Sequence, residues 1–206
     1  MNVNNQNTEQ AILEAAEKLF IEKGFAGAKT TEIAKLAGVN HALLHYYFRT
    51  KENLFNCVFE RIASHLVEYF NFAFDGDAPF FEKLRTATEL HFDCLTTHIE
   101  LPMFVFREVI QKKERKDYLL KQLFPYMKRI LAKMHSDIKR EVKKGTIRPV
   151  KAQNLLLNIA SLNVFSIIAA AVIYDVKDEN NIDEVMLFLE GRKENNVNTI
   201  INSLKL

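Results

Sequence analysis

The scarcity of turn-forming residues is the feature that most limits what this chain can fold into. Its 206 residues include only six Gly and four Pro, the residue types that most often end helices and form tight turns. No stretch alternates apolar and polar residues over a useful length, so no β-strand is expected. The sequence therefore predicts an all-α fold built from long helices with few connections.

The first fifty residues are expected to form short helices after one longer one. Apolar residues recur at three- and four-residue steps along residues 8–23, which predicts an amphipathic helix that ends at Gly24. Thr30 is expected to cap the next helix, and Asn40 and Thr50 are expected to cap two more. These closely spaced caps indicate short helices joined by tight turns.

Longer helical patterns follow, separated by turn-rich segments. Proline is favoured at the first position of a helix, so Pro79, Pro102 and Pro125 are each taken to mark a helix start. The expected helices cover residues 51–74, Pro79 to about residue 99, a segment from Pro102, a basic segment from Pro125 to Gly145, residues 152–174 and residues 182–204.

Residues 155–174 are mainly apolar over a length that could also span a membrane. Asn and Ser side chains interrupt this run, and no aromatic belt flanks it. We therefore prefer a buried helix and expect no membrane partner. A helix that is apolar on most sides needs cover on most sides, so part of the cover is expected from a second subunit.

Residues 30–47 combine a helix, a turn containing Gly38 and a second helix, which is the helix-turn-helix arrangement. The outward side chains of the second helix would meet base edges in the major groove of DNA, and the flanking hydroxyl and ammonium groups suit phosphate oxygens. Periodicity alone also fits a helix pair in an ordinary helical core. The candidate DNA-binding residues are Lys29, Thr30, Thr31, Asn40, His41, Ala42, Leu43, His45, Tyr46, Tyr47 and Lys51.

A set of short motifs at fixed spacing strengthens the DNA-binding interpretation. The motifs are Gly24-Phe25, Thr30-Thr31, Ile33-Ala34, Ala37-Gly38-Val39, Leu44, Tyr47-Phe48, Lys51-Glu52 and Leu54. Together they resemble the N-terminal region of TetR/AcrR transcriptional regulators. The resemblance implies an all-helical homodimer in which residues 1–50 form a three-helix DNA-binding domain with a helix-turn-helix. Residues 51–206 would form a larger helical domain that binds a ligand and dimerises through 152–174 and 182–204.

Two positions depart from the pattern of that family. Asn40 stands where Ser is usual and is an equivalent helix cap. His45 stands where an aromatic residue is usual. His45 can still donate to a phosphate, but a neutral imidazole adds no charge. His41 and His45 lie four residues apart on one expected helix face, which suggests the hypothesis that DNA affinity depends on pH.

Charge is distributed unevenly along a chain with a formal net charge of +2. Residues 1–55 hold six basic and six acidic residues, so the candidate DNA-binding region is formally neutral. Residues 112–151 hold fourteen basic and four acidic residues. This basic segment is either a second surface for nucleic acid or the solvated face of an amphipathic helix, and we prefer the second interpretation.

The C-terminal region offers candidates for ligand binding. The chain has sixteen Phe and no Trp, and much of the Phe lies between residues 55 and 124, which favours an apolar or aromatic effector. The candidate ligand-binding residues are Phe70, Phe92, Phe104 and Tyr126. His91, Cys94 and His98 share one helical face and suit Zn²⁺, but one helix rarely presents three convergent ligands, so no metal and no cofactor is expected.

Motifs of phosphate-binding loops, serine hydrolases and zinc proteases are missing from the sequence, so no enzyme is expected. Two cysteines and a polar N-terminus favour the cytoplasm. The sequence predicts a repressor that a small, largely apolar effector releases from double-stranded operator DNA. The alternative is a helical small-molecule-binding or metal-sensing protein without DNA-binding activity.

Overall fold

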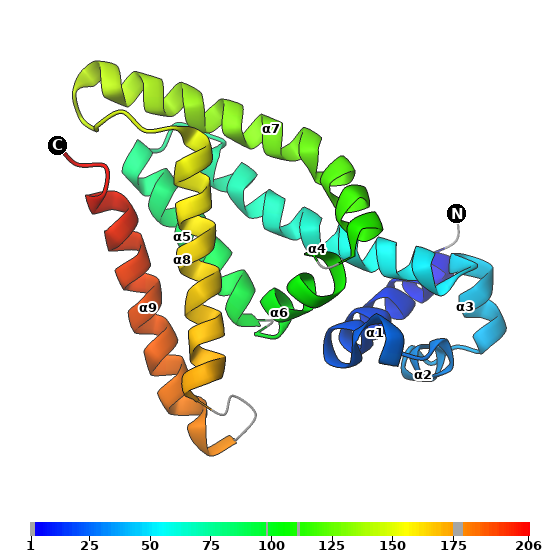
Figure 1. Cartoon of the computed structure of the whole chain (residues 1–206). Coiled ribbons are helices and arrows are strands. Elements are labelled where there is room, and N and C mark those ends of the chain that lie inside the picture. Colours follow the sequence, from blue (N-terminus) through cyan, green and yellow to red (C-terminus); the bar gives the residue numbers. More distant parts are fainter. Residues whose placement is uncertain (1–2, 98, 111, 175–178) are drawn as a thin grey trace. The chain divides into compact units, whose positions relative to one another are not determined.

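The computed structural model describes residues 3–97, 99–110, 112–174 and 179–206, and within them all regular elements are helical (Figure 1). This confirms the predicted all-α class. The α-helices are α1 (Val3–Gly27), α2 (Thr30–Leu36), α3 (His41–Phe48), α4 (Lys51–Phe74), α5 (Phe80–Thr97), α6 (Leu101–Val105), α7 (Lys113–Lys144), α8 (Ala152–Ile173) and α9 (Ile182–Asn202). A π-helical turn, η1 (Phe106–Ile110), follows α6, and a 3₁₀ turn, η2 (Glu179–Asn181), precedes α9.

The helices form two compact units. Unit 1 comprises Met1–His65 and Met103–Gln122, and unit 2 comprises Leu66–Pro102 and Leu123–Leu206. Helices α4 and α7 each contribute one end to each unit. The domain boundary expected at residue 50 was drawn between a DNA-binding and a ligand-binding function, and it does not coincide with the boundaries of the two compact units. The functional boundary remains a prediction.

Two of the three predicted caps in the N-terminal region are confirmed. The Asn40 side chain accepts a hydrogen bond from the backbone N–H of Leu43 at 2.8 Å, and the Thr50 hydroxyl accepts from Asn53 at 3.1 Å. The prediction for Thr30 is wrong, because Lys29 occupies the cap position of α2 without a side-chain hydrogen bond. Thr30 is the first helical residue, and its hydroxyl is engaged by α3 instead.

Prolines mark helix starts less reliably than predicted. Helix α5 begins at Phe80, so Pro79 lies just before it. Pro125 lies inside α7, and the prediction of a new helix there is wrong. A proline within a helix removes one backbone hydrogen bond and crowds the preceding turn, but the helix continues where other interactions compensate. In α7 the buried residues Ile130 and Met134 hold the following turns to the core of unit 2.

Unit 2 has an apolar core crossed by a buried polar network. Helices α5, α8 and α9 pack against one another, with Leu84, Ile159 and Ile200 among the side chains between them. The Asn163 amide nitrogen lies 2.9 Å from the Thr88 carbonyl oxygen and 3.0 Å from His91 Nδ1, and the Asn196 amide donates to Asn163 Oδ1 at 3.0 Å. These bonds fix the register of the three helices, because shifting one helix would leave buried polar groups unpaired.

Helix α8 is long and apolar enough to cross a membrane by length and composition, with a mean hydropathy of 2.2, but core helices of soluble proteins pass the same test. Only 33% of its most apolar window is buried within the chain. Its other side exposes large apolar residues, notably Leu157, Phe165 and Val172. Within this chain, α8 is therefore covered on one side and open on the other.

Candidate nucleic-acid interface

Helix α3 lies in unit 1 with one face buried and one face open. Leu44 is 1% exposed and Phe48 is 5% exposed, so these two side chains anchor α3 in unit 1. Helix α2 is one of the elements that pack against α3. On the opposite face, His41, Ala42 and His45 are exposed, and Tyr46 is 75% exposed. Four of the predicted DNA-binding residues therefore lie on the exposed face of one helix, and the major groove of DNA is wide enough to admit such a helix.

The two histidines of this surface are held by specific contacts. His41 Nε2 lies 2.9 Å from the Thr30 hydroxyl, which ties α3 to the start of α2. His45 Nδ1 lies 3.0 Å from the Arg49 carbonyl oxygen, and Arg49 itself has a positive φ of 58° at the end of the helix. The His41 and His45 rings meet edge to face with centroids 4.4 Å apart.

The remaining predicted DNA-binding residues border the helix pair. Lys29 and Thr31 are exposed at the start of α2, and Asn40 caps α3, while Leu43 and Tyr47 are half-buried. Lys51 is also half-buried, with its ammonium 4.6 Å from the centroid of the Phe25 ring. Burial, followed by the charge of Arg115, lowers the pKa of Lys51. All these residues border one helix pair, and their contact with DNA remains a prediction.

An ion cluster within unit 1 was not found by sequence reasoning. Arg115, near the start of α7, holds Glu52 with Nε–Oε1 and Nη2–Oε2 distances of 3.0 and 3.3 Å, and its Nη1 lies 2.9 Å from Glu108 Oε2. Its guanidinium also lies 4.0 Å from the Phe25 ring centroid and 4.3 Å from that of Phe55. Glu108 lies on η1 and Arg115 on α7, so the spacing of the two residues in the sequence does not predict their contact.

Glu108 connects the same cluster to the break in α1. Gly24 has a φ of 71°, and a Cβ placed there would lie 2.7 Å from Glu108 Oε1. Burial alone would raise the pKa of Glu108, but a hydrogen bond from Lys112 and the charges of Lys112 and Arg115 bring it below its usual value. The backbone N–H of Phe25 also donates to this carboxylate. The break in α1 at Gly24 therefore lies against Glu108, a residue 84 positions further along the chain.

The structure separates the predicted ligand-binding residues. Phe70 and Phe92 are buried in unit 2, with the Phe70 ring 5.4 Å from that of His91. Phe104 belongs to unit 1 and packs against Phe55 and Phe59, while Tyr126 is 51% exposed. Their role in ligand binding remains a prediction.

The alternative metal site finds no support among the described residues, which contain no group of three or more His, Cys, Asp or Glu able to hold a metal ion. His91 Nδ1 faces the Asn163 amide, Cys94 is half-buried, and His98 lies outside the described residues. Because an amide N–H donates, this contact makes Nδ1 of His91 an acceptor and places the ring hydrogen on Nε2.

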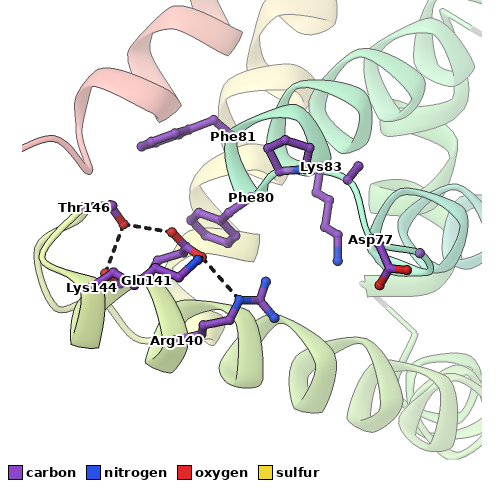
Figure 2. A pocket seen from close by; sticks show the side chains of 11 residues that line it. Asp77, Phe80, Phe81, Lys83, Arg140, Glu141, Lys144 and Thr146 are labelled. Atoms are coloured by element: carbon purple, nitrogen blue, oxygen red, sulfur yellow. Dashed lines mark hydrogen bonds and ion pairs between the residues drawn. The ribbon is translucent and has the colours of Figure 1, made fainter.

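A cavity of about 430 Å³ in unit 2 lies between the start of α5 and the end of α7 (Figure 2). Phe80 and Phe81 provide its apolar wall. The buried ion pair Lys83–Asp137 lies at 3.0 Å beside it, and Glu141 accepts from Lys144 at 3.0 Å. The hydrogen bonds of Glu141 with Lys144 and Thr146 lower its pKa. The predicted residues Phe70, Phe92, Phe104 and Tyr126 are not part of its lining.

Helix α2, the turn after it and α3 form a helix-turn-helix. One face of α3 is buried, and the other exposes polar and aromatic side chains, as in DNA-binding proteins of this class. Residues 12–58 match the family described as bacterial regulatory proteins, tetR family. The chain belongs to the TetR/AcrR family of helix-turn-helix transcriptional regulators, as the sequence motifs indicated. It is a non-enzymatic family, in agreement with the expectation from the sequence.

Individual proteins extend this similarity. The chain is 28% identical over 151 residues to the uncharacterized HTH-type transcriptional regulator YhgD of Bacillus subtilis, covering 68% of this chain and 72% of YhgD. It is 44% identical over 55 residues to the HTH-type transcriptional repressor NicS of Pseudomonas putida, covering 27% of this chain and 26% of NicS. The B. subtilis regulator FadR in complex with stearoyl-CoA shares the fold, with a TM-score of 0.69 and 19% identity over 94% of this chain and 98% of FadR.

Proposed function

We propose that this protein is a homodimeric transcriptional repressor that binds double-stranded operator DNA through α3 and that a small, largely apolar effector releases it. In this proposal residues 1–50 bind DNA, and residues 51–206 bind the effector and dimerise. The protein would act in the cytoplasm, where its DNA target lies. A repressor, NicS, is among the similar regulators and supports this direction of regulation.

One observation carries the DNA-binding part of the proposal. Helix α3 is anchored by Leu44 and Phe48, is capped by Asn40, and presents His41, His45 and Tyr46 to solvent. A rigid helix with hydrogen-bonding side chains on its open face is what direct readout of base edges requires. Exposed Lys29 and Thr31 at the start of α2 would contact phosphates on either side.

The dimer is proposed to form through residues 152–174 and 182–204, which include α8 and α9. These two helices lie side by side in unit 2 (Figure 1). Both expose large apolar side chains, including Leu157 and Phe165 on α8 and Met186 and Leu187 on α9. Exposed large apolar side chains often mark association surfaces in proteins, and a second copy offers a matching surface.

The effector is proposed to bind in unit 2 near Phe70 and Phe92, whose rings provide an apolar environment on α4 and α5. The stearoyl-CoA bound to FadR shows that this fold can accept a ligand with a long apolar chain. Phe104 belongs to unit 1 and Tyr126 is exposed, so the proposed site in unit 2 is based on Phe70 and Phe92. An effector that prefers a conformation with lower DNA affinity would release the operator, and DNA would weaken effector binding by the same factor.

The proposal is tested by selecting bound duplexes from a random DNA pool and then screening apolar and amphiphilic compounds for release. We expect selected duplexes that share an inverted repeat with half-sites about one helical turn apart. We also expect at least one compound class to release them at fixed salt. Failure to enrich any shared sequence would contradict the regulator proposal, and release by polar compounds alone would contradict the proposed effector class.

A further inference from the structure

The cavity in unit 2 has an apolar wall and a charged rim, and the proposed function does not use it. Its volume of about 430 Å³ lies within the range of pockets that hold small molecules. Phe80 and Phe81, at the start of α5, form the wall, with ring centroids 6.0 Å apart (Figure 2). Two such rings offer offset or edge-to-face contacts to an aromatic molecule. The wall therefore favours a ligand with a flat, apolar body.

A buried ion pair lies beside this wall. Lys83 and Asp137 are both buried, and Lys83 Nζ lies 3.0 Å from Asp137 Oδ2. The other oxygen of the same carboxylate, Asp137 Oδ1, lies 2.6 Å from Nη2 of Arg140. Both oxygens of Asp137 thus have a cationic partner from the chain itself, so this carboxylate does not call for a cation on a ligand.

Glu141, the acidic residue of α7 that lines the cavity, is occupied in the same way. Its Oε1 accepts from Lys144 at 3.0 Å and from Arg140 Nε at 3.3 Å. Its Oε2 accepts from the Thr146 hydroxyl at 2.9 Å. Both oxygens of Glu141 therefore have donors within the chain, and the end of α7 offers a ligand few acceptors.

Donors remain at the same end of the cavity. The side chains of Arg140 and Lys144 are exposed, and a guanidinium and an ammonium carry more N–H groups than their contacts with two carboxylates use. Asp77 is the other acidic residue of the lining, and Figure 2 shows it at the end of the cavity away from Lys144 and Thr146. An anionic group would therefore be placed at the α7 end, beside the apolar wall and away from Asp77.

We propose that this cavity is a second ligand site of the chain and that it takes a small aromatic carboxylate. The rings of Phe80 and Phe81 contact the body of the ligand, and Arg140 and Lys144 donate to its carboxylate through charge-assisted hydrogen bonds. The residues of the proposed effector site do not line this cavity. The inference therefore goes beyond the proposed function, and it does not depend on DNA binding.

Isothermal titration calorimetry of the full chain with naphthoate, in the absence of DNA, tests the proposal. We expect saturable binding with one site per chain. The double variant Arg140→Gln/Lys144→Gln should weaken binding about tenfold or more, because charge-assisted hydrogen bonds are lost. Lys139 and Lys143 are exposed on the same helix but do not line the cavity. The matched variant Lys139→Gln/Lys143→Gln removes the same charge and should bind within about twofold of the wild type, because only long-range attraction is lost.

A neutral analogue tests the chemical class of the ligand. Naphthalenemethanol has the same rings without the charge, and it should bind about tenfold more weakly than naphthoate or not at all. Equal affinity of the acid and the alcohol would overturn the inference. Equal naphthoate affinity of the two double variants would overturn it as well, and so would the absence of saturable binding at millimolar naphthoate.

Thermal unfolding keeps the test valid if the double variant is less stable. Naphthoate should raise the unfolding temperature of the wild type and of Lys139→Gln/Lys143→Gln, and it should raise that of the cavity variant less, because a ligand stabilises the folded state that binds it. Lys144→Gln alone changes one exposed side chain and should still weaken binding about threefold. Unchanged binding by this variant and by the double variant would show that the cavity does not hold the carboxylate.

Discussion

At the scale of single residues, Gly24 and His91 occupy positions where few other side chains would fit. Gly24 combines a φ of 71° with a carboxylate that would lie 2.7 Å from a Cβ. His91 is a buried imidazole whose neutral form fits its partner Asn163. Each residue makes a distinct, measurable contribution to stability.

Replacing Gly24 by Ala should destabilise the protein. The positive φ and the close approach of Glu108 Oε1 both oppose a side chain there, and together they should cost about 1–3 kcal/mol in the free energy of unfolding. Gly191, inside α9, is the matched control, since nothing lies within 4 Å of a Cβ placed there. Gly191→Ala should stabilise by about 0.5–1 kcal/mol. Urea unfolding checks both, and equal effects of the two variants would contradict the account.

His91 should make stability depend on pH in the acid range. Burial lowers the pKa of His91 from 6.5 to about 4. Between these values the unfolded chain binds a proton that the folded protein excludes, so the contribution is complete above pH 6.5 and declines as pH falls toward 4. The full loss is about 3 kcal/mol.

The comparison with His91→Gln isolates this contribution, because Gln keeps an acceptor for Asn163 but does not titrate. Chemical unfolding at several pH values should show the wild type losing more stability than the variant between pH 6.5 and pH 4. Parallel curves for the two proteins would show that His91 does not titrate in this window.

At the scale of elements, the segment formed by α6, η1 and the start of α7 contributes to the packing of unit 1, which its sequence alone does not predict. From Met103 onward it packs within unit 1, where Arg115 links Glu108 on η1 to Glu52 on α4. Helices α1 to α4 were predictable because caps and apolar spacing are local signals. The Arg115 cluster was not, since the pairing of Glu52 with Arg115 spans 63 positions and depends on tertiary packing. The helix start predicted at Pro125 was wrong for a similar reason, because the continuation of α7 past this proline depends on tertiary packing of Ile130 and Met134.

Replacing Arg115 by Met should therefore destabilise unit 1. Met retains an apolar stem against Phe25 and Phe55 but leaves the buried Glu108 with fewer partners, at a cost of about 3 kcal/mol. Arg107→Met is the control, because the Arg107 side chain is 51% exposed beside the same carboxylate and its loss should cost less than about 1 kcal/mol. Thermal unfolding distinguishes them. A loss for Arg107→Met as large as that for Arg115→Met would contradict the importance of burial.

At the scale of the whole molecule, the proposed dimer relates two features. Residues 1–55 carry no formal net charge, and unit 2 exposes apolar side chains through which two copies would associate. A formally neutral DNA-binding region gives weak non-specific attraction, so affinity must come from two specific half-site contacts made together. Dimerisation is then a condition for tight operator binding.

Charge placed on the open face of α8 should separate the subunits. Phe165 is 69% exposed and lies on the proposed dimer surface, so Phe165→Asp should convert a dimeric hydrodynamic mass to a monomeric one at micromolar concentration. Phe72, 71% exposed on α4, lies outside the proposed surface, and Phe72→Asp should remain dimeric. Sedimentation velocity checks both variants. A monomeric wild-type protein would refute the proposed dimer.

The most direct test of the central claim is the affinity of a selected operator duplex for the wild-type protein, Tyr46→Ala and Tyr126→Ala. Both tyrosines are exposed, but only Tyr46 lies on α3. If α3 reads the DNA, Tyr46→Ala should weaken binding about tenfold to a hundredfold, while Tyr126→Ala binds like the wild type. Equal affinity of all three proteins for the duplex would contradict DNA recognition by this face of α3.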